Sequence, residues 1–121
     1  MRTDEVVKRI CRLPVDFYGG SKSMVQLVAE SGIGACLALL TVANIEAYLS
    51  MHPYLVEDWL RWSANKRVAS GWYFKRQDNH FVVGLYPKGE TLTLSESALA
   101  CAEFVVREVN ALAAMTPRAK N

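Results

Sequence analysis

The first half of the chain spaces its apolar residues as amphipathic helices do, rather than alternating them as strands do. Thr3 is a suitable start for the first helix. Its apolar residues are Val6, Val7, Ile10 and Cys11. Proline disfavours helical geometry in the residue before it, so we expect Pro14 to end this helix and residues 15–18 to form a connector.

A second helix is predicted to begin near Ser21 or Ser23 and to end at Ser31, because Gly32 suits the left-handed backbone that often follows a helix. Residues 33–40 are apolar without a clear period. They fit either a buried helix or a connector.

Two further helices follow around a histidine–proline break. Thr41 is a suitable N-cap for a helix over 42–51, and Pro53 suits the first turn of a helix from 54 to about 64. At about 100° per residue, the apolar residues of the latter helix share one face. They are Leu55, Val56, Trp59, Leu60 and Trp62.

The pattern changes at Gly71 to aromatic and β-branched residues. We therefore predict two antiparallel strands, over residues 71–76 and 80–86, joined by a turn at residues 77–79. A third short strand over 90–94 also fits the pattern.

The last apolar face predicts a helix from about 96 to 115, in which Glu103 and Arg107 pair on the solvent side. Thr93 and Glu96 match the capping box, in which each side chain binds the other's backbone amide. Phe104 falls on the polar side beside Glu108, so we expect it to be exposed, where it could serve a homodimer or partner contact.

These elements predict an α+β fold with a helical N-terminal half, an antiparallel β-hairpin or three-stranded sheet, and a long C-terminal helix packed on it. The length of 121 residues fits one domain. We expect that domain to cover residues 1–115 and residues 116–121 to form a flexible tail.

Composition narrows the function classes. The chain is 51% hydrophobic and 21% charged with a net charge of +2, which is typical of globular proteins and not of dedicated nucleic-acid binders. Its first residues are too charged for a signal peptide, and its longest apolar run is too short for a membrane span. The three cysteines, Cys11, Cys36 and Cys101, are widely spaced among apolar neighbours, so we expect all three to be buried, reduced thiols, as is typical of cytoplasmic proteins.

The sequence does not contain the known cofactor-binding, metal-binding or catalytic motifs with the residue spacing that each of them requires. The segment Gly19–Ser23 lacks the glycine that a phosphate-binding loop needs directly before its lysine. No cysteine pair has zinc or redox spacing. His52 and His80 belong to no catalytic signature. We therefore expect no cofactor, no metal and no enzymatic activity.

The densest feature is residues 59–76, which hold all three tryptophans of the chain among several lysines and arginines. In one interpretation the tryptophans are core, while Lys66 and Arg67 complement the negative end of a helix dipole. In the other, some rings and cations stay outside, in the combination enriched at binding hot spots.

The second interpretation defines a candidate partner-binding site. Its predicted anchors are Trp62, Lys66, Arg67 and Trp72. Glu57 and Asp58 would add acidic charge that steers a basic partner.

The run His52–Ser63, followed by Lys66-Arg67 and Gly71–Phe74, resembles small uncharacterised bacterial proteins, some of them of the immunity type that neutralises a companion toxin. The resemblance extends over residues 41–108. It implies tight protein binding rather than a particular fold, and it supplies no catalytic residue.

We therefore expect a small cytosolic protein-binding domain, with a protein partner such as a toxin. Two alternatives stay open. The basic and aromatic residues of 59–76 could instead bind nucleic acid through phosphate contacts and base stacking, or the chain could be a small enzyme whose site has no recognised motif.

Overall fold

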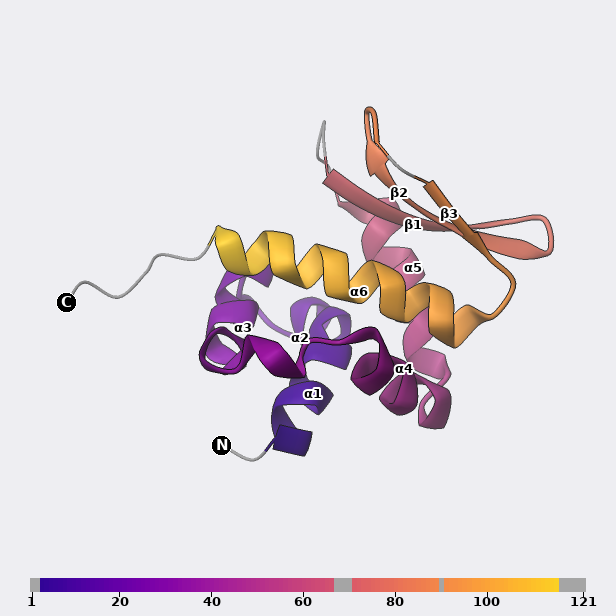
Figure 1. The fold of residues 1–121 in the computed structure, drawn as a ribbon. Coiled ribbons are helices and arrows are strands. Elements are labelled where there is room, and N and C mark those ends of the chain that lie inside the picture. Colours follow the sequence, from indigo (N-terminus) through magenta and orange to yellow (C-terminus); the bar gives the residue numbers. More distant parts are fainter. Residues whose placement is uncertain (1–2, 67–70, 90, 116–121) are drawn as a thin grey trace.

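The computed structural model describes residues 3–66, 71–89 and 91–115. Its elements follow the predicted order and confirm the α+β fold class (Figure 1). In chain order they are α1 (Thr3–Cys11), α2 (Leu13–Gly19), α3 (Met24–Glu30), α4 (Val42–Met51), α5 (Tyr54–Asn65), β1 (Gly71–Gln77), β2 (His80–Tyr86), β3 (Thr91–Leu94) and α6 (Ser97–Ala114). The expected tail, 116–121, lies outside the described residues.

Helix α6 lies between the sheet and the N-terminal helices, and Figure 1 shows it crossing the middle of the fold. It packs against α3 and α4 on one side and against β1 and β2 on the other. A helix covered on two sides has to be apolar around most of its circumference. The buried residues of α6 are Ala100, Cys101, Ala102, Phe104, Val105, Glu108 and Val109.

The prediction that Phe104 is exposed is wrong. Its side chain is 0% exposed. The ring stacks on Phe74 with centroids 5.6 Å apart and meets Trp59 edge-on at 5.9 Å. The helical wheel failed here because the sheet covers the face of α6 that seemed polar. Phe104 is therefore a core residue and not a contact for a second copy of the chain.

The sheet has the strand order β1-β2-β3 and is antiparallel throughout. The register aligns Phe74, Val83 and Leu92 in one row across the three strands. Phe74 and Val83 are buried and Leu92 is half-buried, so this row belongs to the face that packs on α6. The third strand is confirmed over Thr91–Leu94; Glu90, its predicted first residue, lies outside the described residues.

Several predicted helix boundaries are confirmed by their capping contacts. The Ser23 hydroxyl accepts a hydrogen bond from the Gln26 amide, and the Thr41 hydroxyl accepts one from the Asn44 amide, both at 3.1 Å. Gly32 has a φ of 90°, in the left-handed region. The ambiguous stretch 33–40 contains two short 3₁₀ helices, Ile33–Ala35 and Leu37–Leu39.

The predicted connector over 15–18 is wrong, because these residues belong to α2. Pro14 does follow the end of α1, but it also lies in the first turn of the next helix, where its missing amide hydrogen has no helical partner to lose. Leu13 and Pro14 are buried, so tertiary packing supports this short helix.

The predicted capping box is also wrong. Thr93 pairs with Val82 in the sheet, and Glu96 occupies the N-cap of α6 without a side-chain capping hydrogen bond. The strand therefore continues through the residue that the motif assigned to the helix start. Pairing with β2 outweighs the local capping preference.

We predict that Phe104→Ala lowers the free energy of unfolding by about 3–5 kcal/mol, because it leaves a cavity between two packed layers. Urea denaturation followed by circular dichroism measures this change. Asn110→Ala, at an exposed position of the same helix, is the control and should change stability by less than about 1 kcal/mol. A loss of similarly small size in Phe104→Ala would contradict the two-sided burial of α6.

Candidate functional site

The structure brings three of the predicted site residues together and separates two others from them. Trp62, Lys66 and Trp72 line one groove. Glu57 and Asp58 lie nearer the start of α5, and Glu57 forms an ion pair with Arg76 of β1. Arg67 lies outside the described residues.

Trp62 and Lys66 both bind the carboxylate of Glu108 on α6. The indole Nε1 of Trp62 donates to Oε2 at 3.0 Å, and the Lys66 ammonium donates to Oε1 at 2.8 Å and to Oε2 at 2.9 Å. The side chains of Lys66 and Glu108 are only 10% and 5% exposed. The positive charge that the sequence suggested for a partner is thus neutralised within the fold.

Trp72 lies at the start of β1 and is half-buried. The guanidinium of Arg107 lies 5.5 Å from the centre of its ring, within the range of a cation–π interaction. Arg107 also forms the predicted ion pair with Glu103. That pair is partly buried rather than fully on the solvent side, since β1 lies next to it.

We call the groove that Trp62, Lys66 and Trp72 line the α6 groove. It has a volume of about 770 Å³ and lies between α2, α3, the end of α5, the start of β1 and the end of α6. Its apolar walls include Phe17, Met24, Trp72, Leu112 and Met115. The Lys66–Glu108 ion pair and the indole of Trp62 also line it.

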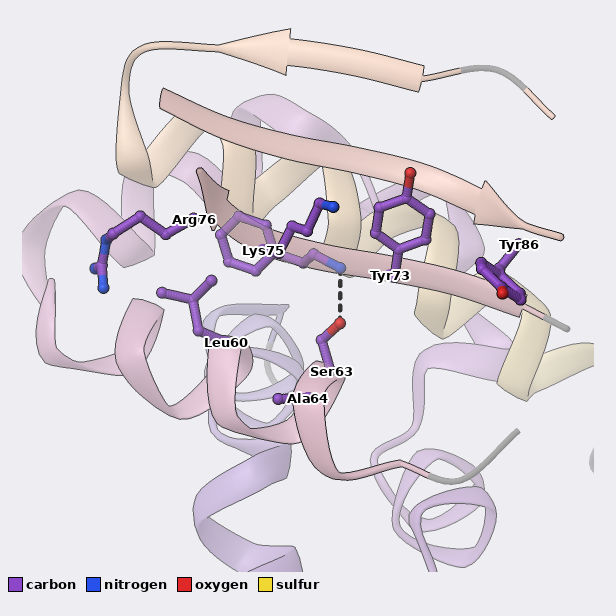
Figure 2. A pocket seen from close by; sticks show the side chains of 8 residues that line it. Leu60, Ser63, Ala64, Tyr73, Lys75, Arg76 and Tyr86 are labelled. Carbon is purple, nitrogen blue, oxygen red and sulfur yellow. Dashed lines mark hydrogen bonds between the residues drawn. The ribbon is translucent and has the colours of Figure 1, made fainter. Parts of the chain in front are cut away.

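A second groove, the α5–β1 groove, has a volume of about 490 Å³ (Figure 2). Helix α5 contributes Leu60, Ser63 and Ala64, while the strands contribute Tyr73, Phe74, Lys75, Arg76 and Tyr86. The Ser63 hydroxyl accepts a hydrogen bond from the Phe74 amide at 2.7 Å, drawn as the dashed line in Figure 2. This contact places α5 against the outer edge of β1.

The ring of Tyr73, which lines this groove, packs against the backbone of the neighbouring strand. The register places Gly84 opposite Tyr73, and a Cβ atom on Gly84 would lie 2.5 Å from the Tyr73 hydroxyl oxygen. The ring of Tyr73 therefore lies across the bare backbone of Gly84. Tyr86 meets it edge-on with centroids 6.5 Å apart, and it is 60% exposed.

The thiols and imidazoles were the candidates for a nucleophilic site. Burial raises the pKa of the Cys11 thiol to about 12, and it raises the pKa of the Cys101 thiol well above its usual range. Both are therefore protonated and weakly nucleophilic at neutral pH. His52 stacks on Tyr48, and its Nδ1 lies 3.1 Å from the Tyr48 carbonyl oxygen.

Residues that could hold a metal ion do not gather in the part of the chain that the structure describes: it contains no group of three or more histidine, cysteine and carboxylate side chains in suitable positions. Within the same residues, no helix combines the length and apolar character that crossing a bilayer requires.

Sequence reasoning missed Glu108, Tyr73 and Tyr86. Strand alternation could have found Tyr73, because it must point opposite to the inward-facing Phe74. Glu108 had no such signal, because its partners lie more than forty positions away in the chain.

Comparison of the chain with protein-family models, with curated proteins and with solved structures gave no significant match.

We predict that Lys66→Met and Glu108→Leu each lower the free energy of unfolding by about 3–5 kcal/mol, because each leaves an unpaired buried charge. The double variant should be less destabilised than the sum of the two. Urea denaturation of the four proteins in a double-mutant cycle measures the coupling. Strictly additive effects would contradict a direct buried ion pair.

We predict that stability falls as the pH rises above about 9. The thiols of the unfolded chain ionise near 9.0, whereas the folded Cys11 thiol ionises only near 12, so the unfolded state loses protons first. Each buried thiol then lowers the free energy of unfolding by up to about 1.4 kcal/mol per pH unit. We would measure the free energy of unfolding by urea denaturation from about pH 8 to about pH 11. It should fall less steeply with pH in the Cys11→Ala/Cys101→Ala variant than in the unaltered protein. Equal slopes would refute this linkage.

Proposed function

We propose that this protein is a small cytosolic protein-binding domain that neutralises a companion toxin by occluding part of its surface. The observation that carries the proposal is the α5–β1 groove with its two adjoining tyrosines (Figure 2). The resemblance to immunity-type proteins is consistent with this function, and the binding residues differ from those expected from the sequence.

The side chains of this surface are of the types that dominate binding energy. Tyr86 and Tyr73 present large rings with hydroxyl groups, and Arg76 presents a guanidinium. Tyrosine and arginine are enriched among hot-spot residues. Trp62, by contrast, is 9% exposed and donates its indole hydrogen bond within the fold, so we assign it no direct partner contact.

The surface is preorganised. Tyr73 rests on Gly84, and Phe74 is held by its backbone hydrogen bond to Ser63 and by its ring contact with Phe104. Rigid anchors lose little conformational entropy on binding, and this favours affinity.

Helix α5 covers the outer edge of β1 through Ser63, so a partner would bind through side chains rather than by adding a strand to β1. The exposed residues on the uncovered face of the sheet extend this binding surface. They include Lys75, Thr91 and Thr93.

The charge of the surface favours an acidic partner. Lys75 and Arg76 line the groove, and the charge of Arg76 is offset by its ion pair with Glu57. We therefore assign steering to Lys75 rather than to Glu57 and Asp58. Arg61 of α5 lies 3.9 Å from the centre of the Tyr18 ring, which lines the α6 groove.

We predict that Tyr86→Ala weakens binding of the companion protein by about 30-fold, equivalent to about 2 kcal/mol. The partner is first identified in the source cell by photo-crosslinking through benzoylphenylalanine placed at position 86. Its affinity for the purified variants is then measured by calorimetry.

Tyr54→Ala is the matched control, because Tyr54 is 56% exposed on α5 and does not line the groove. It should bind as tightly as the unaltered protein, and benzoylphenylalanine at position 54 should capture no partner. Equal crosslinking at both positions, or crosslinking at position 86 to nucleic acid alone, would overturn the proposal.

A further inference from the structure

The α6 groove has the size and lining of a small-molecule site. Its volume of about 770 Å³ lies within the range of about 300–1,000 Å³ that is typical of ligand pockets. Such pockets combine apolar walls with a few convergent polar groups. Here the walls come from four helices and β1, and the buried polar groups are Trp62, Lys66 and Glu108. The groove is also lined, at exposed positions, by Tyr18, Ser23 and Asn65.

Two of these polar groups, Lys66 and Glu108, form a buried ion pair. Lys66 and Glu108 are 10% and 5% exposed and bind each other through both carboxylate oxygens. An anionic ligand that approached the Lys66 ammonium would also lie next to the negatively charged Glu108 carboxylate, which would repel it. A cationic ligand that approached Glu108 would be repelled by Lys66 in the same way. Like-charge contacts in a desolvated site are costly, so the ion pair selects against both and favours a neutral ligand.

The pair can still form hydrogen bonds with such a ligand. An ammonium has three donors and a carboxylate accepts about four hydrogen bonds. Among the described residues, Lys66 donates two hydrogen bonds, and the carboxylate of Glu108 accepts these two and one from Trp62. One donor and one acceptor are therefore not used in hydrogen bonds with described residues, and the ammonium also lies 5.6 Å from the centre of the Phe104 ring. We assign this donor and this acceptor to the ligand.

We propose that the α6 groove binds a neutral, largely apolar small molecule whose N–H, O–H or carbonyl group hydrogen-bonds to the Lys66–Glu108 ion pair. This proposal does not depend on the proposed function. Among the described residues the two grooves have no lining residue in common, although a smaller hollow of about 310 Å³ is lined by residues of both, including Lys66, Trp72, Tyr73 and Tyr86.

Two fluorescent probes with one aromatic skeleton test the charge preference. N-phenyl-1-naphthylamine is neutral and carries one N–H donor, whereas 8-anilinonaphthalene-1-sulfonate adds a negative charge to the same rings. We expect the neutral probe to bind the folded protein at one saturable site, at least about tenfold more tightly than the sulfonate. Fluorescence titration measures both affinities.

Two variants locate the site. Ala111 lines the groove at an exposed position of α6, so Ala111→Trp should obstruct it and weaken binding of the neutral probe by about tenfold or more. Ala47→Trp makes the same change at an exposed position of α4 outside the groove and should leave binding unchanged. Glu108→Gln leaves the Lys66 charge unpaired and should reverse the preference in favour of the sulfonate.

The proposal is overturned if the neutral probe shows no saturable binding, if it binds Ala111→Trp as well as it binds Ala47→Trp, or if the sulfonate binds the unaltered protein more tightly. The Ala111→Trp comparison decides the matter even where Glu108→Gln does not fold, because Ala111 is exposed.

Discussion

Helix α6 buries two opposite faces at once, and most of the structure follows from that constraint. The face toward the sheet carries the ring of Phe104, whereas the opposite face carries smaller buried residues such as Ala102 and Val109. Phe104 contacts Phe74 of β1 and Trp59 of α5, so one side chain links three elements. Trp59 in turn donates a hydrogen bond to the carbonyl of Cys11 at 2.9 Å, which connects the same cluster to the end of α1.

The same constraint buries Glu108, and a buried carboxylate needs partners. Lys66 and Trp62 supply them from the end of α5. This arrangement withdraws a lysine and a tryptophan from the surface and leaves them as part of the wall of the α6 groove. The buried carboxylate thus accounts for the inward position of two residues, Lys66 and Trp62, that the sequence placed among the candidates for an exposed surface.

The strand register also determines which side chains of β1 point away from α6. Because strand residues alternate between faces, the inward position of Phe74 requires Tyr73 and Lys75 to point outward. Gly84 gives the Tyr73 ring a flat support, and Ser63 holds α5 at the edge of β1. The core contact of Phe74 with Phe104 and the outer α5–β1 groove are therefore two consequences of one strand register.

The sequence by itself determined the features that depend on neighbouring residues: the caps at Ser23 and Thr41, the left-handed Gly32, the extent of α4 and the two strands of the hairpin. Each rests on interactions within a few positions of the chain. Tertiary structure decided the burial of Phe104, the pairing of Glu108 with Lys66 and the start of α6 after Glu96. In those cases a distant segment covers or pairs with the residue, and burial against that segment outweighs the local preference that a periodic pattern measures.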